Sequence, residues 1–277
     1  MGIWSKVLNS SIMFATTTTD ILFFIFGLIV GSFLNVVIYR YNTGMTLGGR
    51  SQCLSCGKTL RWYELIPVFS FLFQGGKCHG CGSKISWQYL LVELATGCLF
   101  LGVWQLDFSL FLIPLYLIVW SLLVVIATYD LRHKIIPDGL VFGFIGVTFV
   151  SLLIRTLLPS FKRLDLMLMA NGILAALVLA GFFWFLWFIS EGKWLGFGDV
   201  KLSLGVGLLL GLKMGISAIA LAFWIGAIVG LLLVFLSKLF FGRRSVNMKS
   251  EFPFAPFIIV GTALVFFFQI NVFNLFF

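Results

Sequence analysis

Long apolar runs separated by short polar links dominate the chain. The first span covers about residues 20–39, and the later apolar segments cover about 88–106, 110–129, 138–158, 167–189, 200–212, 215–237 and 254–275. A run of about 20 apolar residues crosses a bilayer as a helix, which satisfies its own backbone hydrogen bonds in lipid. The pattern therefore predicts an all-α polytopic membrane protein with about eight transmembrane helices.

Glycine marks two of these segments. Gly27 and Gly31 are spaced four residues apart in the first span, as on a face for close helix packing. The sixth segment, 200–212, is short and carries or adjoins four glycines, so we expect it to be tilted, broken or partly re-entrant. Residues 1–19 are expected to form a short polar tail.

Composition supports a membrane location. Hydrophobic residues make up 61% of the 277 residues, mean hydropathy is +1.10, and only 10% of the residues are charged. The net charge of +9 would suggest nucleic acid in a soluble protein, but here Lys and Arg orient the spans and meet anionic headgroups. We therefore expect lipid and no nucleic acid as a partner. The first span lacks a small-residue cleavage site, so no cleavable signal peptide is expected.

Basic residues also predict the threading. With the N-terminus outside, the loops on the inner side hold 14 of the 19 Lys and Arg, and these loops are 40–87, 130–137, 190–201 and 238–253. The positive-inside rule therefore favours an outer N-terminus. The single long hydrophilic segment suggests three parts, which are a tail with the first span (1–39), a cytoplasmic cysteine-rich loop (40–87) and a polytopic region (88–277).

The cysteine-rich loop contains two Cys-x-x-Cys pairs, formed by Cys53, Cys56, Cys78 and Cys81. Each pair can fold into a tight knuckle that aims two thiolates at one point, and two knuckles complete a tetrahedron around zinc. We expect a small zinc-ribbon-like module with a structural metal and no open coordination position. The alternatives are free thiols in a reducing compartment or, less readily inside the cell, a disulfide. His79 could replace one ligand.

Two acids lie where apolar segments meet polar links. The chain has only ten Asp and Glu, and on the predicted topology Asp130 ends the third span and Asp199 begins the sixth, both on the inner side. Two converging carboxylates share a proton, so one can take a proton from water while the other donates to a scissile carbonyl. The alternatives are an N-cap for Asp199 and, for Asp130, an ion pair with Arg132, His133 or Lys134.

Three further expectations concern the acids. Asp130 lies near a helix C-terminus and Asp199 near a helix N-terminus, so helix dipoles predict that Asp199 is the readier base. Asp138 follows Pro137 and competes for the catalytic role, although an N-cap is the simpler interpretation. Glu93 lies about one turn inside the second span, where we expect it to pair with an Arg or Lys of the loop.

These motifs together resemble one family. The matching stretches are Gly31-Ser-Phe-Leu-Asn-Val-Val-Ile-Tyr-Arg40, the double Cys-x-x-Cys loop, Val92-Glu93-Leu94 with Gly97, Asp130-Leu-Arg with Ile136-Pro137-Asp138, Gly196-Phe-Gly-Asp-Val-Lys-Leu202, and Pro253-Phe-Ala-Pro256. In this order the sequence resembles the type IV prepilin peptidases, or leader peptidase/N-methyltransferases, which are intramembrane aspartic proteases of the Gly-x-Gly-Asp type.

The resemblance implies a bifunctional enzyme of the bacterial inner membrane. It would cleave the basic leader of prepilins and pseudopilins on the cytoplasmic face and methylate the new N-terminus with S-adenosylmethionine. The resemblance places the catalytic aspartates at Asp130 and Asp199. Gly196 and Gly198 lack side chains, so an extended substrate backbone could approach closely there, and Lys201 is expected beside the same approach. Which system the enzyme serves stays open between pili, type II secretion and DNA uptake.

The methyl-donor site is open. No glycine-rich dinucleotide fingerprint is present, and Glu64, the only acid of the loop, is the candidate, with a solvated partner of Arg61 as its alternative. Two other functions also stay open. One is a prepilin-type peptidase without methylation, and the other is a zinc-stabilised membrane transporter or assembly scaffold, which would leave the two aspartates without a role.

Overall fold

The structure is a computed structural model that describes residues 2–44, 46, 48–106, 108–157, 166–241 and 253–276. It contains two compact units, Met1–Val125 and Ile126–Phe277, and each is considered by itself. Most of the predicted loop 238–253 lies outside the described residues.

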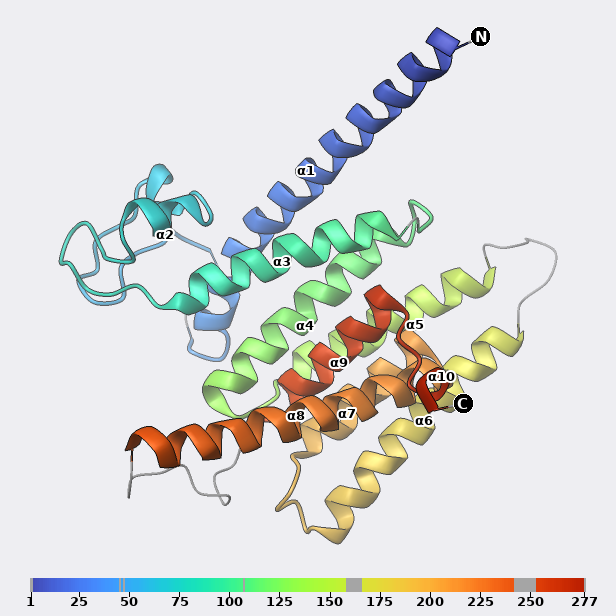
Figure 1. The fold of residues 1–277 in the computed structure, drawn as a ribbon. Coiled ribbons are helices and arrows are strands. Elements are labelled where there is room, and N and C mark those ends of the chain that lie inside the picture. Colours follow the sequence, from blue (N-terminus) through green and yellow to red (C-terminus); the bar gives the residue numbers. More distant parts are fainter. Residues whose placement is uncertain are drawn as a thin grey trace. The chain divides into compact units, whose positions relative to one another are not determined.

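Every predicted apolar segment contains a helix (Figure 1). The corresponding helices are α1 (Gly2–Arg40), α3 (Trp87–Gln105), α4 (Ile113–His133), α5 (Asp138–Leu157), α6 (Leu166–Ile189), α7 (Phe197–Leu210), α8 (Leu212–Phe241) and α9 (Ala255–Phe268). Six of them contain spans long and apolar enough to cross a membrane, and α7 and α9, with 14 residues each, are shorter. The expected all-α, multi-pass membrane protein is confirmed.

Some predicted boundaries are wrong. The expected polar tail is helical from Gly2 onward, because α1 continues without a break to Arg40. Helix α7 ends at Gly211, which has a φ of 75°, and α8 begins at the next residue. Glycine adopts such a positive φ without steric cost. The last span is also shorter than expected, because Gln269 adopts a left-handed conformation and ends α9, and a short helix, α10 (Phe273–Phe276), follows.

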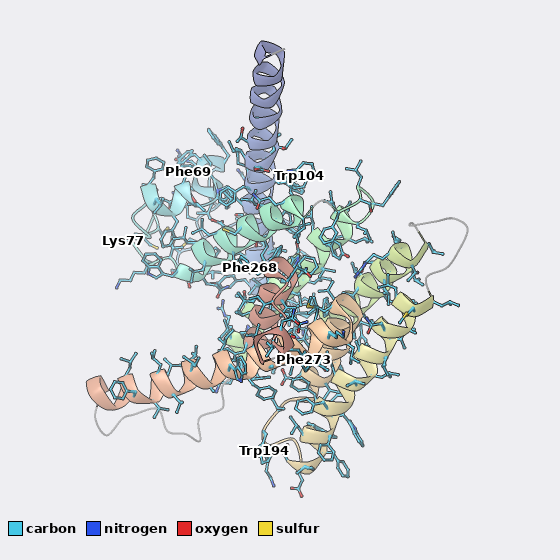
Figure 2. The ribbon with its side chains drawn as sticks, turned by 45° about the vertical axis from the view of Figure 1, so that its right-hand side comes forward. Phe69, Lys77, Trp104, Trp194, Phe268 and Phe273 are labelled. Atoms are coloured by element: carbon cyan, nitrogen blue, oxygen red, sulfur yellow. The ribbon has the colours of Figure 1, made fainter. Side chains whose placement is uncertain are left out.

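In Met1–Val125, α1 and α3 pack closely at the predicted glycines. A Cβ on Gly27 would lie 2.8 Å from the Cα of Gly97, and one on Gly31 would lie 2.8 Å from the Cα of Glu93. Such close backbone approach is what small residues allow between membrane helices. The amide of Asn35 donates across the pair to the Tyr89 carbonyl at 3.2 Å. At the other end Trp104, labelled in Figure 2, stacks on Phe23 with ring centroids 4.4 Å apart.

The segment between α1 and α3 is a small irregular module. It contains a single 3₁₀ turn, η1 (Trp62–Leu65), and a five-residue helix, α2 (Phe69–Phe73). Two isolated antiparallel bridges, Gln52 with Thr59 and Lys77 with Lys84, close one hairpin around each Cys-x-x-Cys pair. Each hairpin turns at a glycine with positive φ, Gly57 in the first and Gly82 in the second, a conformation that glycine adopts readily.

In Ile126–Phe277, α7 is the central helix. It packs against α5, α6, α8 and α9, and most of its residues are buried. Its glycines are the contact points: Gly205 lies against the Phe144 ring of α5, and a Cβ on Gly207 would lie 2.5 Å from the Ala176 nitrogen of α6. Glycine therefore brings neighbouring backbones together here, and protein surrounds this short helix.

Candidate active site and candidate metal centre

Asp130 and Asp199 lie on different helices of the same unit, and both are buried. Asp130 is on the last turn of α4, and Asp199 is the third residue of α7, with 4% of each residue exposed. An electrostatic interaction links Asp130 with Asp199. Acids far apart in the sequence thus share one region of the fold.

Each carboxylate is held by a backbone N–H at a helix N-terminus. Asp199 accepts from Gly196, the N-cap of its own helix, while its own N–H donates to the Gly196 carbonyl at 3.1 Å. Asp130 accepts from Ala255, the first residue of α9. The positive ends of two helices therefore face the pair of acids and offset part of the cost of burying negative charge there.

One carboxylate oxygen of Asp199 lacks a hydrogen-bond partner among the described residues. This oxygen, Oδ1, is buried. The three ion pairs formed by the described side chains involve neither Asp130 nor Asp199. Since an unpaired buried carboxylate oxygen is costly, it indicates a site that binds a water, a proton or a substrate group.

Two of the simpler interpretations find no support in this geometry. Gly196 occupies the N-cap position, and Asp199 contributes to capping from inside the first turn. Asp130 bonds to Ala255 instead of forming an ion pair with a cation of the following loop. The dipole contrast predicted between the two acids also loses its basis, because Asp130 meets the N-terminus of α9 as well as the C-terminal end of α4.

The Ala255 N–H could not be identified from the sequence as part of the site. A backbone donor leaves no mark on the pattern of side-chain types, and Ala255 is a fully buried, apolar residue. The available signal was Pro256 beside it, since proline in the first turn marks a helix start. A helix that begins at a membrane surface presents free N–H groups there.

The predicted substrate-approach residues differ in their surroundings. Gly196 is open, with Asp199 Oδ2 and the Gly198 nitrogen, both 3.9 Å from a built Cβ, as its nearest neighbours. Gly198 is not open, because a Cβ there would lie 2.7 Å from the Cβ of Ile136. Lys201 points to Asp138, with Nζ 2.7 Å from Oδ1. Asp138 is therefore an ion-pair partner on the first turn of α5, not the N-cap.

The four cysteines of the module converge as expected. Their Sγ atoms all lie within 4.8 Å of one another, and those of Cys53 and Cys81 are 3.9 Å apart. A tetrahedral zinc with Zn–S bonds of about 2.3 Å separates its sulfurs by about 3.8 Å, whereas a disulfide brings them to about 2 Å. The cluster can therefore hold a metal ion. His79 is not one of its members.

The knuckles favour anionic sulfur at Cys53 and Cys81. At Cys56 a hydrogen bond from the Lys58 backbone is outweighed by the Cys81 and Cys53 sulfurs, which raise the pKa of that thiol to about 11. Backbone N–H groups of Cys56 and Ser55 lower the pKa of Cys53 to about 6, and the Ser83 hydroxyl and N–H lower the pKa of Cys81. The N–H of Gly80 also points to the Cys78 Sγ at 3.3 Å. Thiolate is the form that binds metal, so the donor set fits zinc.

Glu64 is engaged within the module. Its Oε2 accepts the Arg61 N–H at 2.7 Å, and its Oε1 pairs with Lys58 Nζ at 3.1 Å. Its side chain is only 1% exposed, so the expectation of a solvated residue is wrong. The Arg61 N–H, and after it Lys58, hold the pKa of Glu64 below its ordinary value. This geometry gives Glu64 a structural role.

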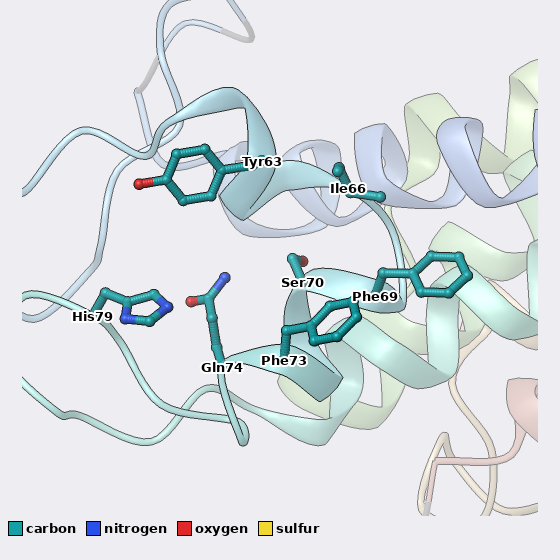
Figure 3. A pocket seen from close by; sticks show the side chains of 7 residues that line it. All are labelled: Tyr63, Ile66, Phe69, Ser70, Phe73, Gln74 and His79. Carbon is teal, nitrogen blue, oxygen red and sulfur yellow. The ribbon is translucent and has the colours of Figure 1, made fainter.

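Beside Glu64 lies a half-open pocket of about 240 Å³ (Figure 3). Aromatic and apolar side chains make most of its lining, and polar groups stand at one end; the residues are Tyr63, Ile66, Phe69, Ser70, Phe73, Gln74 and His79. Pockets of this kind, mostly apolar with a few polar groups, are typical of small-molecule sites.

Glu93 joins three parts of Met1–Val125. Its Oε2 accepts the N–H of Val68 at 2.7 Å, and its side chain also bonds to Ser32 of α1. The expected loop Arg or Lys partner is therefore wrong. Val68 has a φ of 64°, which is strained for a β-branched residue, and the bond to Glu93 helps to hold it there.

Comparison with known proteins agrees with this geometry. Two family models match, the Bacterial Peptidase A24 N-terminal domain over residues 25–106 and the Type IV leader peptidase family over residues 116–231. The prepilin leader peptidase/N-methyltransferase of Bacillus subtilis is 35% identical over 245 residues, 88% of this chain and 92% of that protein. Two further proteins of that name are similar. The Myxococcus xanthus protein is 35% identical over 82% of this chain and 67% of that protein, and the Vibrio cholerae protein is 28% identical over 89% of this chain and 96% of that protein. No solved structure matches significantly. The chain belongs to the type IV leader peptidase family.

Proposed function

We propose that this protein cleaves the leader peptide of type IV prepilins and pilin-like proteins and N-methylates the new N-terminal residue. The curated relatives carry both activities in their names. The observation that supports the proteolytic half most strongly is the pair Asp130 and Asp199, buried together with one oxygen of Asp199 unpartnered. This pair distinguishes an aspartic protease from a transporter or assembly scaffold, which would need neither acid.

The proteolytic step needs one protonated and one ionised carboxylate. Asp199 Oδ1, which lacks a partner among the described residues, is the oxygen that would hold the attacking water or the shared proton. The ionised carboxyl takes a proton from water, and the protonated one donates to the scissile carbonyl oxygen. The helix N-termini at Gly196 and Ala255 stabilise the remaining negative charge. We place the substrate backbone at Gly196, where the space beside the glycine is open.

The cysteine cluster would hold zinc through Cys53, Cys56, Cys78 and Cys81. When bound, zinc would cross-link the two hairpins of the module. All four positions would be filled by thiolate, so the ion would have no role in proteolysis.

The methylation half needs a site for S-adenosylmethionine. Glu64 is a poor candidate, since both of its oxygens bind within the module. We place the adenine of the donor in the pocket between Tyr63 and Phe73, where aromatic side chains can stack on a base.

Phe73 is 86% exposed. Replacing it by Ala should lower methylation about tenfold, as loss of one stacked base would, and leave cleavage unchanged. Loss of both activities together would contradict this assignment.

One assay tests the proteolytic proposal. Purified protein, a prepilin with a basic leader and S-adenosylmethionine are incubated, and the products are read by mass. Asp130→Asn and Asp199→Asn should each reduce cleavage at least about 1,000-fold, while Glu191→Gln, which alters an exposed acid, should not. Full cleavage by either Asn variant would refute the proposal. Cleavage without any added methyl mass would support the peptidase that lacks methylation.

We also propose that the protein lies in the bacterial inner membrane with its N-terminus outside. The inner loops then carry most of the basic residues, as the positive-inside rule requires. Both Asp130 and Asp199 then lie at the cytoplasmic side, where the leader of a prepilin is found.

A further inference from the structure

One ion pair spans the two helices beside the paired aspartates. Lys201 Nζ of α7 lies 2.7 Å from Asp138 Oδ1 of α5, although the residues are 63 positions apart in sequence. The same ammonium lies over two aromatic rings, 5.3 Å from the centroid of Phe142 and 5.2 Å from that of Phe197. The side chain of Lys201 is 22% exposed. The rings attract the ammonium through their faces and cover it in part, whereas the Asp138 side chain is 63% exposed.

A packing contact beside this ion pair joins the same two segments. The link between α4 and α5 places the Ile136 side chain where Gly198 would carry a Cβ, at 2.7 Å. Gly198 is therefore small because Ile136 fills its place. The start of α7 is thus held to the segment after α4 by an apolar contact at Gly198 and by the ion pair of Lys201.

The connectivity makes these contacts part of a closed ring. From Asp130 the chain runs eight residues to Asp138, crosses the ion pair to Lys201, and returns two residues to Asp199. The Ile136–Gly198 contact lies inside this ring. A ring this short leaves little freedom in the separation of the two carboxylates.

We propose that Asp138 and Lys201 are positioning residues that fix the distance between the catalytic aspartates, with Phe142 and Phe197 holding the Lys201 ammonium in place. Neither residue is assigned contact with the reacting atoms. This proposal rests on the proposed proteolytic function, and it assigns Lys201 a role inside the enzyme in place of the expected contact with substrate.

The test compares Asp138→Asn and Lys201→Met with the charge-reversed double variant Asp138→Lys with Lys201→Asp, using prepilin cleavage. Misplacement of reacting groups by about 1 Å can cost about 100-fold, so each single variant should lower kcat about 10- to 100-fold with KM almost unchanged. Lys201→Arg and the charge-reversed double variant should both be more active than the single variants. Each should recover at least about a third of the loss in log kcat. Glu191→Gln, which breaks an exposed pair within one loop, is the matched control and should stay within about twofold of the parent.

Three outcomes would overturn the proposal: unchanged kcat in the single variants, a loss confined to KM, or a reversed pair no better than the single variants. A loss confined to KM would instead make Asp138 a contact for the basic leader. Hydrogen exchange of the amides of residues 198–200 gives a readout independent of catalysis, and it should be faster in Asp138→Asn than in Glu191→Gln. If hydrogen exchange changes as expected but the parent protein cuts no prepilin, the proposed function fails. The structural role of the Asp138–Lys201 ion pair would then still hold.

Discussion

At the scale of single residues, the proposed proteolytic function rests on rare polar groups in the apolar part of the chain. Asp130 and Asp199 could be chosen from sequence because only ten acids are present and because these two lie at segment ends. Their partners could not be chosen. The Ala255 N–H is a backbone donor, and the carboxylate of Asp138 meets Lys201 only after folding brings positions 63 apart together.

The two glycines of the Gly-x-Gly-Asp motif should respond differently to alanine. Gly198→Ala would push its methyl group into Ile136, 2.7 Å away, and should lower kcat about tenfold or more by moving Asp199. Gly196→Ala has room and an extended backbone with φ −74°, so it should fold normally and raise KM where the substrate backbone approaches. Steady-state cleavage by each variant checks this, and a normal Gly198→Ala enzyme would contradict the packing explanation.

Glu64 gives a pH-dependent prediction for the cysteine-rich module. Its pKa is lower in the folded than in the unfolded chain, so its stabilisation is complete above the unfolded value of about 4.3 and is lost as pH falls through the lower folded value. Glu64→Gln should therefore destabilise the module at pH 7 by about 1 kcal/mol.

This difference between the parent and Glu64→Gln should shrink toward zero below about pH 4. Rates of proteolysis within residues 48–86 at pH 7 and at low pH, with the metal-loaded protein compared with its variant under each condition, provide the measurement. A difference that persists unchanged in acid would show that Glu64 acts through packing alone.

At the scale of helices, the apolar pattern predicted which elements exist but not how they end. Helix ends depend on single residues such as Gly211 and Gln269, whose backbone conformations override apolar neighbours. The glycines of α7 predict a tilted or broken segment. In the structure they instead allow close contact with the Phe144 ring and with the backbone of α6. Spacing alone does not show whether a glycine loosens a helix or brings another helix close.

Alanine at two helical glycines should therefore change stability in opposite directions. Gly207→Ala adds a methyl group 2.5 Å from the Ala176 nitrogen, and it should destabilise the protein by about 1–3 kcal/mol. Gly146→Ala in α5 has no atom within 4 Å of the added Cβ, and it should stabilise by about 0.5–1 kcal/mol through helix propensity. Thermal unfolding in detergent compares the two, and equal effects would argue against close α6–α7 packing.

At the scale of the whole molecule, length and hydropathy identify a multi-pass membrane protein, and the distribution of basic residues predicts its orientation. Cysteine labelling can test that orientation. With an outer N-terminus, Leu110→Cys before α4 should react with a membrane-impermeant maleimide in intact cells, whereas Trp194→Cys between α6 and α7 should react only after permeabilisation. Leu110 is 77% and Trp194, labelled in Figure 2, 70% exposed, so either site is accessible to reagent. The parent protein supplies the background from the five native cysteines, and the reverse result would invert the topology.

The bond from Glu93 to Val68 has a practical consequence for exchanging parts among relatives. A chimera that swaps only residues 41–86 would keep Glu93 and Ser32 from one parent. The residue at position 68, whose N–H donates to Glu93, would come from the other parent. A donor segment without the positive φ at Val68 would leave the Glu93 carboxylate between α1 and α3 without its backbone donor, and Ser32 alone would bind it. A transplanted module should therefore begin within α1 before Ser32 and end within α3 after Glu93, so that both residues come from the same parent.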